Sequence, residues 1–378
     1  MNLEFQEYRT RKILNTYKHV DGWFWNKYSA HPYIGCRSGC EFCYLRGGVH
    51  LGRRDPNTFD THIQVKMNAV ELLTRELARV EKEVIACGDW QQPAEERYTL
   101  SRQMLQVVRD AAFPLFIVER SPLLARDIDL LTDIHQRADV RIVISLSNVD
   151  EKLKRLFEPR SPGLQRRLKL MAALANGGIP VGTSLMPILP FIGDRKDQIE
   201  EAIRATKDHG GTYIVAGGLT MAGVQAERSL NAAREYDPST EEKWRKFFNW
   251  HEGGQPNYGP TRKYNSNLGL RVRELCTNHN IKDRMPRPIR YAKFPLNKRI
   301  AEKLLLKVYD LELEQAHTSR VWAYRKAAWA IDELPYSVGG KSEEELQTIE
   351  GVGASVAQEI ARWMKEDSPQ RTQSSQRI

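Results

Sequence analysis

The chain has 378 residues, 41% of them hydrophobic and 8 of them tryptophan, a composition that predicts a folded protein of more than one domain and excludes a largely disordered chain. The formal net charge of +9 favours an anionic partner, and residues 293–378 hold equal numbers of basic and acidic side chains, so the excess lies in the first 292 residues. No apolar run reaches the roughly 18 residues of a membrane span and no signal peptide opens the chain, so we expect a cytoplasmic protein without a membrane partner.

Residues 1–30 interleave basic and aromatic side chains, Trp23 and Trp25 among them. Such a stretch can stack on bases and contact phosphates, but aromatic side chains also pack over a domain core. We expect residues 1–30 to form an N-terminal cap.

Three cysteines then follow one another at a C-x3-C-x2-C spacing, as Cys36, Cys40 and Cys43. Thiolates bind iron–sulfur clusters and zinc. Ferredoxin-type clusters usually take four cysteines, so three would leave one iron open to another ligand. The alternative is a structural zinc ion with His31 or His50 as the fourth ligand. Five cysteines in all, an odd set with three in one loop, argue against a disulfide framework and favour a reducing compartment.

After the cysteine loop, strand and helix patterns alternate, and apolar strands joined by helices predict a parallel sheet covered by helices. The number of these strand–helix units is near six, which predicts an α/β protein with a partial (β/α)6 barrel. Residues 226–292 are rich in Gly, Pro and Asn, with one predicted helix at 265–279, and we expect them to close a first domain at 31–292. The predicted strands are 63–69, 83–87, 115–118, 140–146, 179–186 and 212–216. The first of these ranges begins as a strand and continues into a helix. The main predicted helices are 100–111, 127–137, 162–176 and 196–207.

Polar side chains follow several of these strands, where parallel β/α folds collect their functional groups. Asp89 and Arg120 come just after two strands, and Ser145 and Ser147 lie two apart, so they face the same side of the sheet. These four are candidates for cofactor binding. The alternative is that they only cap helices.

From about residue 293 the pattern becomes helical, with predicted helices near 303–313 and 323–332. A final pair of helical segments is joined by Gly351-Val352-Gly353. Two glycines allow a tight turn whose free N–H groups, at a helix N-terminus, favour a phosphate oxygen. Gly351, Val352, Gly353 and Ser355 are therefore the phosphate-binding candidates of a small all-α domain at 293–367, and they become DNA-binding candidates through the resemblance given below. The alternative is a protein-interaction domain with a chance Gly-Val-Gly. The polar residues 368–378 are expected to be a disordered tail.

The cysteine loop resembles that of radical S-adenosylmethionine (SAM) enzymes, and the similarity extends over about residues 30–290 to the branch that contains spore photoproduct lyase. This resemblance implies a [4Fe-4S] cluster held by Cys36, Cys40 and Cys43, with SAM on the open iron and cleaved by one electron to a 5′-deoxyadenosyl radical. It also implies SAM contacts for the four strand-end residues. The matching stretches are Val65-Lys66-Met67-Asn68-Ala69, Gln92-Pro93-Ala94-Glu95, Ser121-Pro122-Leu123, Glu158-Pro159-Arg160-Ser161-Pro162 and Pro187-Ile188-Leu189-Pro190.

The resemblance further implies two catalytic residues. Cys87, at a strand end, matches a cysteine that donates a hydrogen atom, and Tyr44 matches a tyrosine that helps pass the radical onward. A second tyrosine of that relay is replaced by Phe42, so the relay is incomplete here. Cys87 equally fits a small buried hydrophobic residue. The C-terminal helices resemble a helix-hairpin-helix and, more widely, the N-terminal domain of family X DNA polymerases.

Together these patterns predict a radical SAM enzyme, and possibly a lyase, acting on DNA by lesion repair such as photoproduct reversal or by base modification. The alternatives are a radical SAM enzyme that modifies RNA or protein, and a non-catalytic Fe–S protein that binds DNA. The expected partners are the backbone of duplex DNA and an electron donor such as flavodoxin or ferredoxin.

Overall fold

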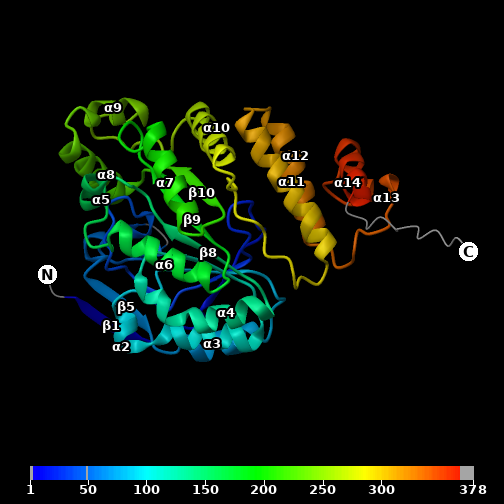
Figure 1. Cartoon of the computed structure of the whole chain (residues 1–378), viewed down its shortest axis with the longest axis horizontal. Helices are drawn as coiled ribbons and strands as arrows, with labels where there is room; N and C mark the ends of the chain where they lie inside the picture. Colours follow the sequence, from blue (N-terminus) through cyan, green and yellow to red (C-terminus); the bar gives the residue numbers. More distant parts are fainter. Residues whose placement is uncertain (1–2, 48–49, 367–378) are drawn as a thin grey trace, which may run out of the picture. The chain divides into compact units, whose positions relative to one another are not determined.

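The computed structural model describes residues 3–47 and 50–366, and the chain divides into two compact units, Met1–Pro288 and one that begins at Ile289 (Figure 1). The strands are β1 Glu4–Tyr8, β2 Leu14–Thr16, β3 Tyr28–Ala30, β4 Tyr33–Ile34, β5 His62–Lys66, β6 Ile85–Gly88, β7 Leu115–Glu119, β8 Val140–Ser145, β9 Val181–Ile188 and β10 Ile214–Gly218. The helices of the first unit are η1 Tyr44–Arg46, η3 Pro56–Thr58, α1 Ala69–Leu77, α2 Ala94–Tyr98, α3 Leu100–Ala111, η4 Pro122–Asp127, α4 Ile128–Arg137, α5 Glu151–Phe157, α6 Leu164–Asn176, α7 Lys196–Asp208, α8 Gly223–Tyr236, α9 Thr240–Phe247 and α10 Arg262–Asn278. Those of the second are α11 Pro295–Leu313, α12 Thr318–Asp332, α13 Glu343–Gln347 and α14 Ala354–Glu366.

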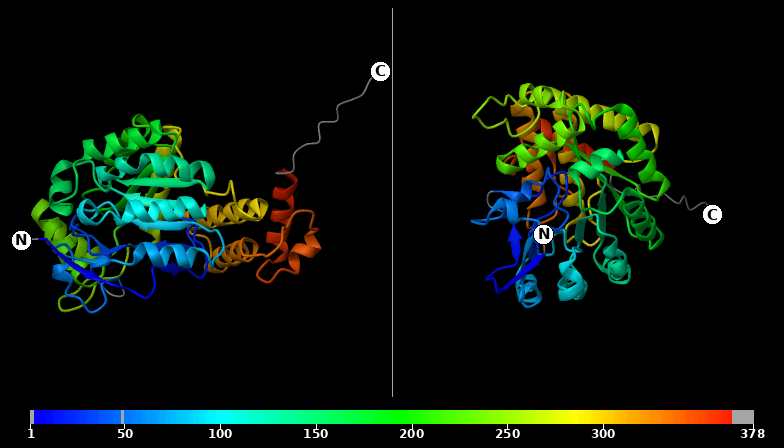
Figure 2. Two further views of the ribbon diagram at one scale, coloured as in Figure 1. Left: turned by 90° about the horizontal axis from the view of Figure 1, so that it is seen from below. Right: turned by 90° about the vertical axis from the view of Figure 1, so that its left-hand side faces the viewer.

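The main sheet of the first unit has the strand order β10-β9-β8-β7-β6-β3-β2. The pairs from β10 to β3 are all parallel, and only β2 runs antiparallel to its neighbour at one edge. Helices connect the parallel strands and lie around the outside of the sheet (Figure 2). The predicted partial (β/α)6 barrel is confirmed.

The six parallel strands are not the six that the sequence predicted. The predicted strand at 63–69 corresponds to β5, which pairs with β1 and β4 in a separate three-stranded sheet. Its place in the barrel is taken by β3, whose Tyr28 and Ser29 pair with Ile85 and Ala86 of β6. β3 lies inside the stretch for which we expected only a cap, and a fully buried strand of three residues shows no periodicity that reveals it.

Alternate residues of the parallel strands face two different environments. Ile85 and Cys87 of β6, like Ile117 of β7 and Ile142 of β8, pack with the helices into the largest hydrophobic core. The intervening positions face the other side of the sheet, and they include small or polar residues such as Ala86 and the paired Ser145 and Ser184 beside apolar ones such as Phe116 and Val143. This alternation leaves room for ligands on one side of the sheet only.

Residues 226–292 are more regular than their glycine and proline content predicted. α8 and α9 precede the expected helix, which is α10. α8 is rich in Ala, Leu, Glu and Arg, which favour helices. Trp244 and Phe248 from the α9 region pack with Phe42 of the cysteine loop and Leu230 of α8 in one buried cluster. The sequence predicted one helix in this segment, and the structure has two more before it.

The described residues of the second unit, up to 366, contain four helices, which confirms the small all-α domain at the C-terminal side. α11 and α12 pack against each other, and α14 contacts both. Ile300, Leu304 and Ile331 are among its fully buried residues. The predicted tail at 368–378 lies outside the described residues. Within the described part of the chain, no helix is long and apolar enough to cross a membrane.

Gly182 of β9 provides a test of the barrel interior. A Cβ at Gly182 would collide with the backbone oxygen and ring of Tyr213, whose hydroxyl donates to the Ile142 carbonyl at 2.7 Å. We predict that Gly182→Ala lowers the free energy of unfolding by about 1–3 kcal/mol in urea denaturation. Gly163→Ala, where a Cβ meets open space, is the control and should change it little. Equal effects of the two substitutions would contradict the packing described.

Candidate active site

The three cysteines lie on a loop that leaves the small sheet after β4 and ends in η1. Gly35, with φ of 95°, starts the loop, and a Cβ there would stand 2.7 Å from the Phe59 carbonyl oxygen. Backbone bonds from Gly39 to the Cys36 carbonyl (3.3 Å) and from Cys43 to the Cys40 carbonyl (3.2 Å) fold the loop back on itself. The turns bring the thiols to one side.

Burial raises the pKa of all three thiols. Asp89 and Cys40 raise the pKa of Cys36 further, and Cys40 and Asp89 contribute to raising that of Cys43 to about 12. These mutual effects mean that the three thiols and the Asp89 carboxyl group lie close together. Asp89 follows β6 in a left-handed backbone conformation, with φ of 55°.

Arg120, just after β7, extends to the same place. Its Nη1 lies 2.9 Å from Cys40 Sγ and 3.4 Å from Glu158 Oε2. Burial alone would lower the pKa of Arg120, but Cys40, Glu158 and Asp89 outweigh it and raise that pKa. The structure therefore brings Asp89 and Arg120 together with the cysteine loop.

Glu158 links Arg120 to a second buried guanidinium. Arg167 of α6 donates through Nη2 to Glu158 Oε2 at 2.5 Å and through Nη1 to the Ser145 carbonyl at 2.9 Å. Glu158 and Arg167 are fully buried or nearly so, at 0% and 2% exposure. Burial by itself would raise the pKa of Glu158, but Arg167 and Arg120 hold it below its ordinary value. The carboxylate is thus charged and fixed between two cations.

Ser145 and Ser147 both lie at the end of β8 and are buried. Ser145 pairs in register with Ser184 of β9 on the inner face. The Ser147 hydroxyl donates to the Met186 carbonyl at 2.7 Å, so this proton ties two neighbouring strands together. The Ser145 carbonyl accepts a hydrogen bond from Arg167, and this bond fixes the end of β8.

Tyr44 and Phe42 point in different directions. Phe42 is buried and stacks on Phe157 with ring centroids 6.4 Å apart. Tyr44 is exposed, and its ring meets His50 edge-on at 5.3 Å. Partial desolvation, followed by Cys43 and Asp89, raises the pKa of Tyr44 to about 12. Tyr44 therefore faces the site as a protonated phenol at neutral pH.

Cys87 is not brought to this site. It belongs to the outward-facing positions of β6 and packs with Ile85 and Ile117 in the core under the helices. Burial is the cause of its raised pKa, with no contribution from Asp89 or the loop cysteines. Because side chains alternate along a strand, a residue on the helix side cannot reach a ligand in the barrel.

His31 and His50, the possible fourth ligands of a structural zinc ion, contact other groups. His31 Nδ1 lies 3.3 Å from the Gly88 carbonyl oxygen, and His50 packs on Tyr44. Among residues 3–47 and 50–366, no three His, Cys, Asp or Glu side chains are placed to share one metal ion. A four-iron cluster distributes its thiolates over different irons, so the loop fits a cluster better than a single zinc ion.

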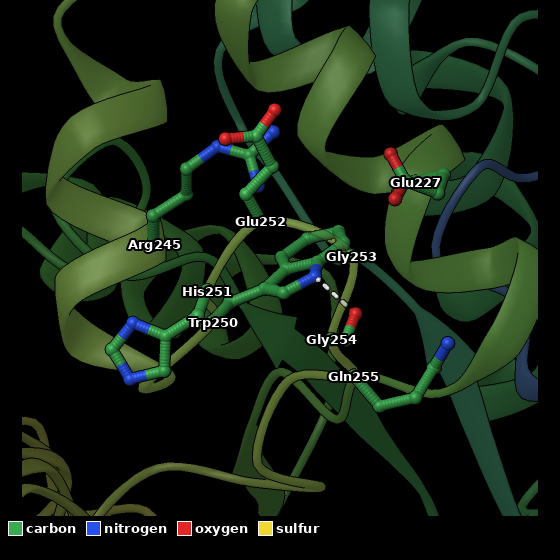
Figure 3. Close-up of a pocket in the computed structure, with 8 residues that line it drawn as sticks. All are labelled: Glu227, Arg245, Trp250, His251, Glu252, Gly253, Gly254 and Gln255. Carbon is green, nitrogen blue, oxygen red and sulfur yellow. Dashed lines mark hydrogen bonds between the residues drawn. The ribbon is translucent and has the colours of Figure 1, made fainter.

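A cavity of about 530 Å³ lies elsewhere in the first unit (Figure 3). It is formed by α8, α9 and the loop that follows, with Arg245 lying over the Trp250 ring at 5.1 Å. Its lining residues include neither the cysteines nor the strand-end candidates. We do not include it in the candidate site.

The hairpin of the second unit joins α13 to α14. Gly351 has φ of 90°, which favours glycine, and Val352 is buried. Gly353, Ala354 and Ser355 are exposed, and within the described residues their N–H groups have no acceptor. The helical hydrogen bonds begin with the next two N–H groups, those of Val356 and Ala357, which donate to the Gly353 carbonyl. Exposed Lys326 of α12 is adjacent, with its backbone 3.5 Å from a Cβ built at Gly351.

Sequence reasoning missed Glu158, Arg160 and Arg167. The stretch Glu158–Pro162 was recognised as similar to photoproduct-lyase relatives, but nothing in it indicated contact with the cysteine loop. Arg167 lies in an ordinary helical pattern. Only the packed structure shows that it is buried against a carboxylate, 2.5 Å away.

Comparison with known proteins agrees with this geometry. Residues 31–205 match the Radical SAM superfamily and residues 295–369 match a helix-hairpin-helix domain. The chain thus contains a radical SAM domain followed by a helix-hairpin-helix domain. A radical SAM domain implies a [4Fe-4S] cluster and SAM as cofactors.

The fold is similar to that of spore photoproduct lyase. A mutant of that enzyme with bound AdoMet and dinucleoside spore photoproduct superposes with a TM-score of 0.53 at 16% identity, over 74% of this chain and 81% of the other. An uncharacterized protein of Mycobacterium tuberculosis is 30% identical over 203 residues, 52% of this chain and 60% of its own length. One of Methanocaldococcus jannaschii is 26% identical over 190 residues, 50% of this chain and 68% of its own length. The chain therefore spans about 60% of the mycobacterial relative.

The buried Glu158 network predicts a strong effect of Arg167. We expect Arg167→Met to lower the free energy of unfolding by about 3–5 kcal/mol, because it leaves a buried carboxylate with one cation fewer. Chemical denaturation measures the change. Arg166→Met is the matched control, since Arg166 is its exposed neighbour on α6, and should cost little. A loss at position 167 no larger than at 166 would show that Glu158 does not depend on Arg167.

Proposed function

We propose that this protein is a radical SAM enzyme that acts on DNA, either in lesion repair such as photoproduct reversal or in base modification. The observation that carries the proposal is the joining of two features in one chain. One is a loop of three clustered thiols beside Asp89 and Arg120, and the other is a hairpin whose N–H groups are free to bind phosphate.

Cys36, Cys40 and Cys43 would hold the cluster. The fit rests on the donor set, because three thiols lie close together on a loop that supplies no fourth cysteine. When bound, the cluster and SAM supply the one-electron chemistry of the reaction. A free-thiol set of this kind needs a reducing compartment, for which we propose the cytoplasm.

Arg120 and Asp89 would orient SAM. The Arg120 guanidinium suits the carboxylate of SAM, and Asp89 suits its amino group. Glu158 and Arg167 would act as positioning residues for Arg120, since Glu158 lies between the two guanidiniums. Ser145 and Ser147 remain candidates for the ribose, Ser147 only as an acceptor because its proton is already donated to the Met186 carbonyl.

Tyr44 is our candidate for hydrogen transfer with the substrate. It is exposed, near Cys43 and Asp89, and its raised pKa keeps its hydrogen in place at neutral pH. A base within a duplex must leave the stack to meet such a residue, which costs a few kcal/mol. We assign no role to Cys87, because its side chain lies in the core on the helix side of the sheet.

The hairpin would hold the DNA backbone. The N–H groups of Gly353, Ala354 and Ser355 would be available to a phosphate, and the exposed Lys326, whose backbone is adjacent to Gly351, would add a positive charge. Contacts of this kind bind the phosphate backbone without reading sequence. The proposal that DNA is the substrate depends on this hairpin more than on the barrel.

The first prediction concerns SAM cleavage. Protein reconstituted anaerobically with iron and sulfide should form 5′-deoxyadenosine from SAM when reduced with dithionite. Cys36→Ala, Cys40→Ala or Cys43→Ala should each abolish the product, whereas Cys276→Ala should not, because Cys276 is buried on α10. Product formation is measured by chromatography. An intact cluster that forms no 5′-deoxyadenosine would reject the enzyme and leave a non-catalytic Fe–S protein.

The second prediction concerns the hairpin. Gly353→Glu should weaken duplex DNA binding about tenfold or more, because a carboxylate would stand where a phosphate is bound. Gly353→Ala is the matched control, since a Cβ there meets open space and the N–H group is kept. Lys326→Gln should reduce the salt slope of binding by about 0.9.

Fluorescence anisotropy with duplex and single-stranded DNA, and with duplex RNA, measures these affinities. Equal binding by Gly353→Glu and Gly353→Ala would argue against the hairpin as a phosphate clamp. Tighter binding to RNA than to DNA would favour an RNA-modifying enzyme instead.

A further inference from the structure

Basic side chains other than Arg120 also lie around the cysteine loop. Three of them reach the surface, Arg37 of the loop itself, Arg160 of the segment after α5, and Arg228 of α8. We call these three the arginine patch. A fourth, Arg46, lies beneath them and is fully buried.

The patch is attached to the backbone of the cysteine loop. Arg160 donates through Nε to the Arg37 carbonyl at 3.0 Å, and Arg37 donates through Nη1 to the Asp60 carbonyl at 3.3 Å. Arg46 donates through Nε to the Cys40 carbonyl at 3.3 Å. These bonds fix the guanidinium groups within one or two residues of Cys36 and Cys40.

The absence of a side chain at Gly39 lets the Arg160 guanidinium lie against the backbone of the cysteine loop. Gly39 has φ of 62°, and a Cβ at this position would overlap the Arg160 guanidinium. The side chain of Arg160 therefore lies directly over the peptide that precedes Cys40. No residue with a larger side chain at position 39 would allow this contact.

Two carboxylates pair with the arginines, but they lie deeper. Arg160 forms an ion pair with Asp60, and their side chains are 36% and 10% exposed. Arg228 pairs with Glu41 at 2.7 Å, and theirs are 30% and 17% exposed. The cations thus face the solvent and the anions lie beneath them, so the surface of the loop is positive.

Three arginines share these two carboxylates, because Arg46 also pairs with Asp60 at 3.2 Å, while Arg37 bonds to the Asp60 backbone carbonyl. Partial burial, followed by Arg37 and Arg46, lowers the pKa of Arg160. This crowding of like charge is left uncompensated by the chain. An anionic partner would relieve it.

The patch and the cofactor candidates lie in different surroundings. Arg120 interacts with Cys40, Glu158 and Asp89, whereas Arg160 pairs with Asp60 and has Arg37, Arg46, Glu41 and Arg228 as further charged neighbours. A partner bound to the patch would therefore contact the backbone of the cysteine loop at Arg37 rather than the groups that interact with Arg120. That arrangement suits the delivery of electrons better than the presentation of a base to Tyr44.

We propose that the arginine patch is the docking surface for a small acidic electron-transfer protein that reduces the cluster. The proposal rests on the proposed function, since it requires a cluster on Cys36, Cys40 and Cys43. One electron passes from the reduced donor to the oxidised cluster, and no bond is made or broken in this step. Such encounters use small interfaces and depend on complementary charge, which the exposed Arg160 and the half-buried Arg37 and Arg228 provide.

The test compares two reductants on the full chain with its reconstituted cluster. Reduction is followed by the loss of the cluster's visible absorption, which requires no SAM cleavage. The protein donor is a photoreduced acidic flavodoxin, and dithionite is the small-molecule control. The variants are Arg160→Glu, Arg160→Gln and Arg228→Glu. The matched control is Arg137→Glu, because Arg137 is an exposed arginine at the end of α4, 54% exposed and paired with Asp133.

We expect flavodoxin to reduce Arg160→Glu and Arg228→Glu about tenfold or more slowly than the wild type at low salt, with a smaller loss in Arg160→Gln. Added salt should slow the wild type towards the variants. Arg137→Glu should behave as the wild type, and dithionite should reduce all of them at the same rate.

Three results would overturn the proposal. Unchanged rates with flavodoxin would show that no acidic donor docks on the patch. Slowing by both reductants alike would show that the arginines act on the cluster itself. Loss of DNA affinity in the Glu variants with normal flavodoxin rates would assign the patch to nucleic acid. Failure of the proposed function is distinct from these, since it would appear in the wild type as a reducible cluster that forms no 5′-deoxyadenosine.

Discussion

A single buried carboxylate, that of Glu158, holds the candidate site together. It accepts from Arg167 and lies within 3.4 Å of Arg120, which in turn touches Cys40. Removing one member of such a buried set leaves a charge without compensation, which costs several kcal/mol. The cysteine loop, the end of β7 and the end of β8 are therefore fixed relative to one another by electrostatics, in addition to the apolar packing of Phe42.

The short segment from Glu158 to Ser161 serves both sides of the loop. Glu158 faces inward to Arg120, and the Ser161 hydroxyl lies 3.8 Å from Cys40 Sγ. Arg160, between them in sequence, turns outward and covers Gly39. One segment thus contributes to the surroundings of the cofactor and to the surface charge. Substitutions within it should not be interpreted as affecting only one of the two.

The repeating pattern of strands and helices was predictable because long apolar strands and amphipathic helices have strong periodicities. β3 was not, because a buried strand of three residues has none, and α8 and α9 were obscured by glycines and prolines nearby. The clustering of Asp89 and Arg120 near the cysteines followed from their place after parallel strands. The position of Cys87 did not, since whether a strand residue faces the barrel or the helices depends on a register that one residue can reverse. Partners such as Arg167 and Glu158 become neighbours only through tertiary folding.

The cysteine loop belongs to one sheet and its neighbours to another. It leaves β4 of the three-stranded sheet, whereas Asp89, Arg120 and Ser145 follow strands of the main sheet. A cluster bound to the loop and a cofactor held by the main sheet would connect the two sheets through bonds that the protein alone does not make. Because metal binding to such a site contributes directly to the free energy of folding, cofactor loading would stabilise the contact between the two sheets.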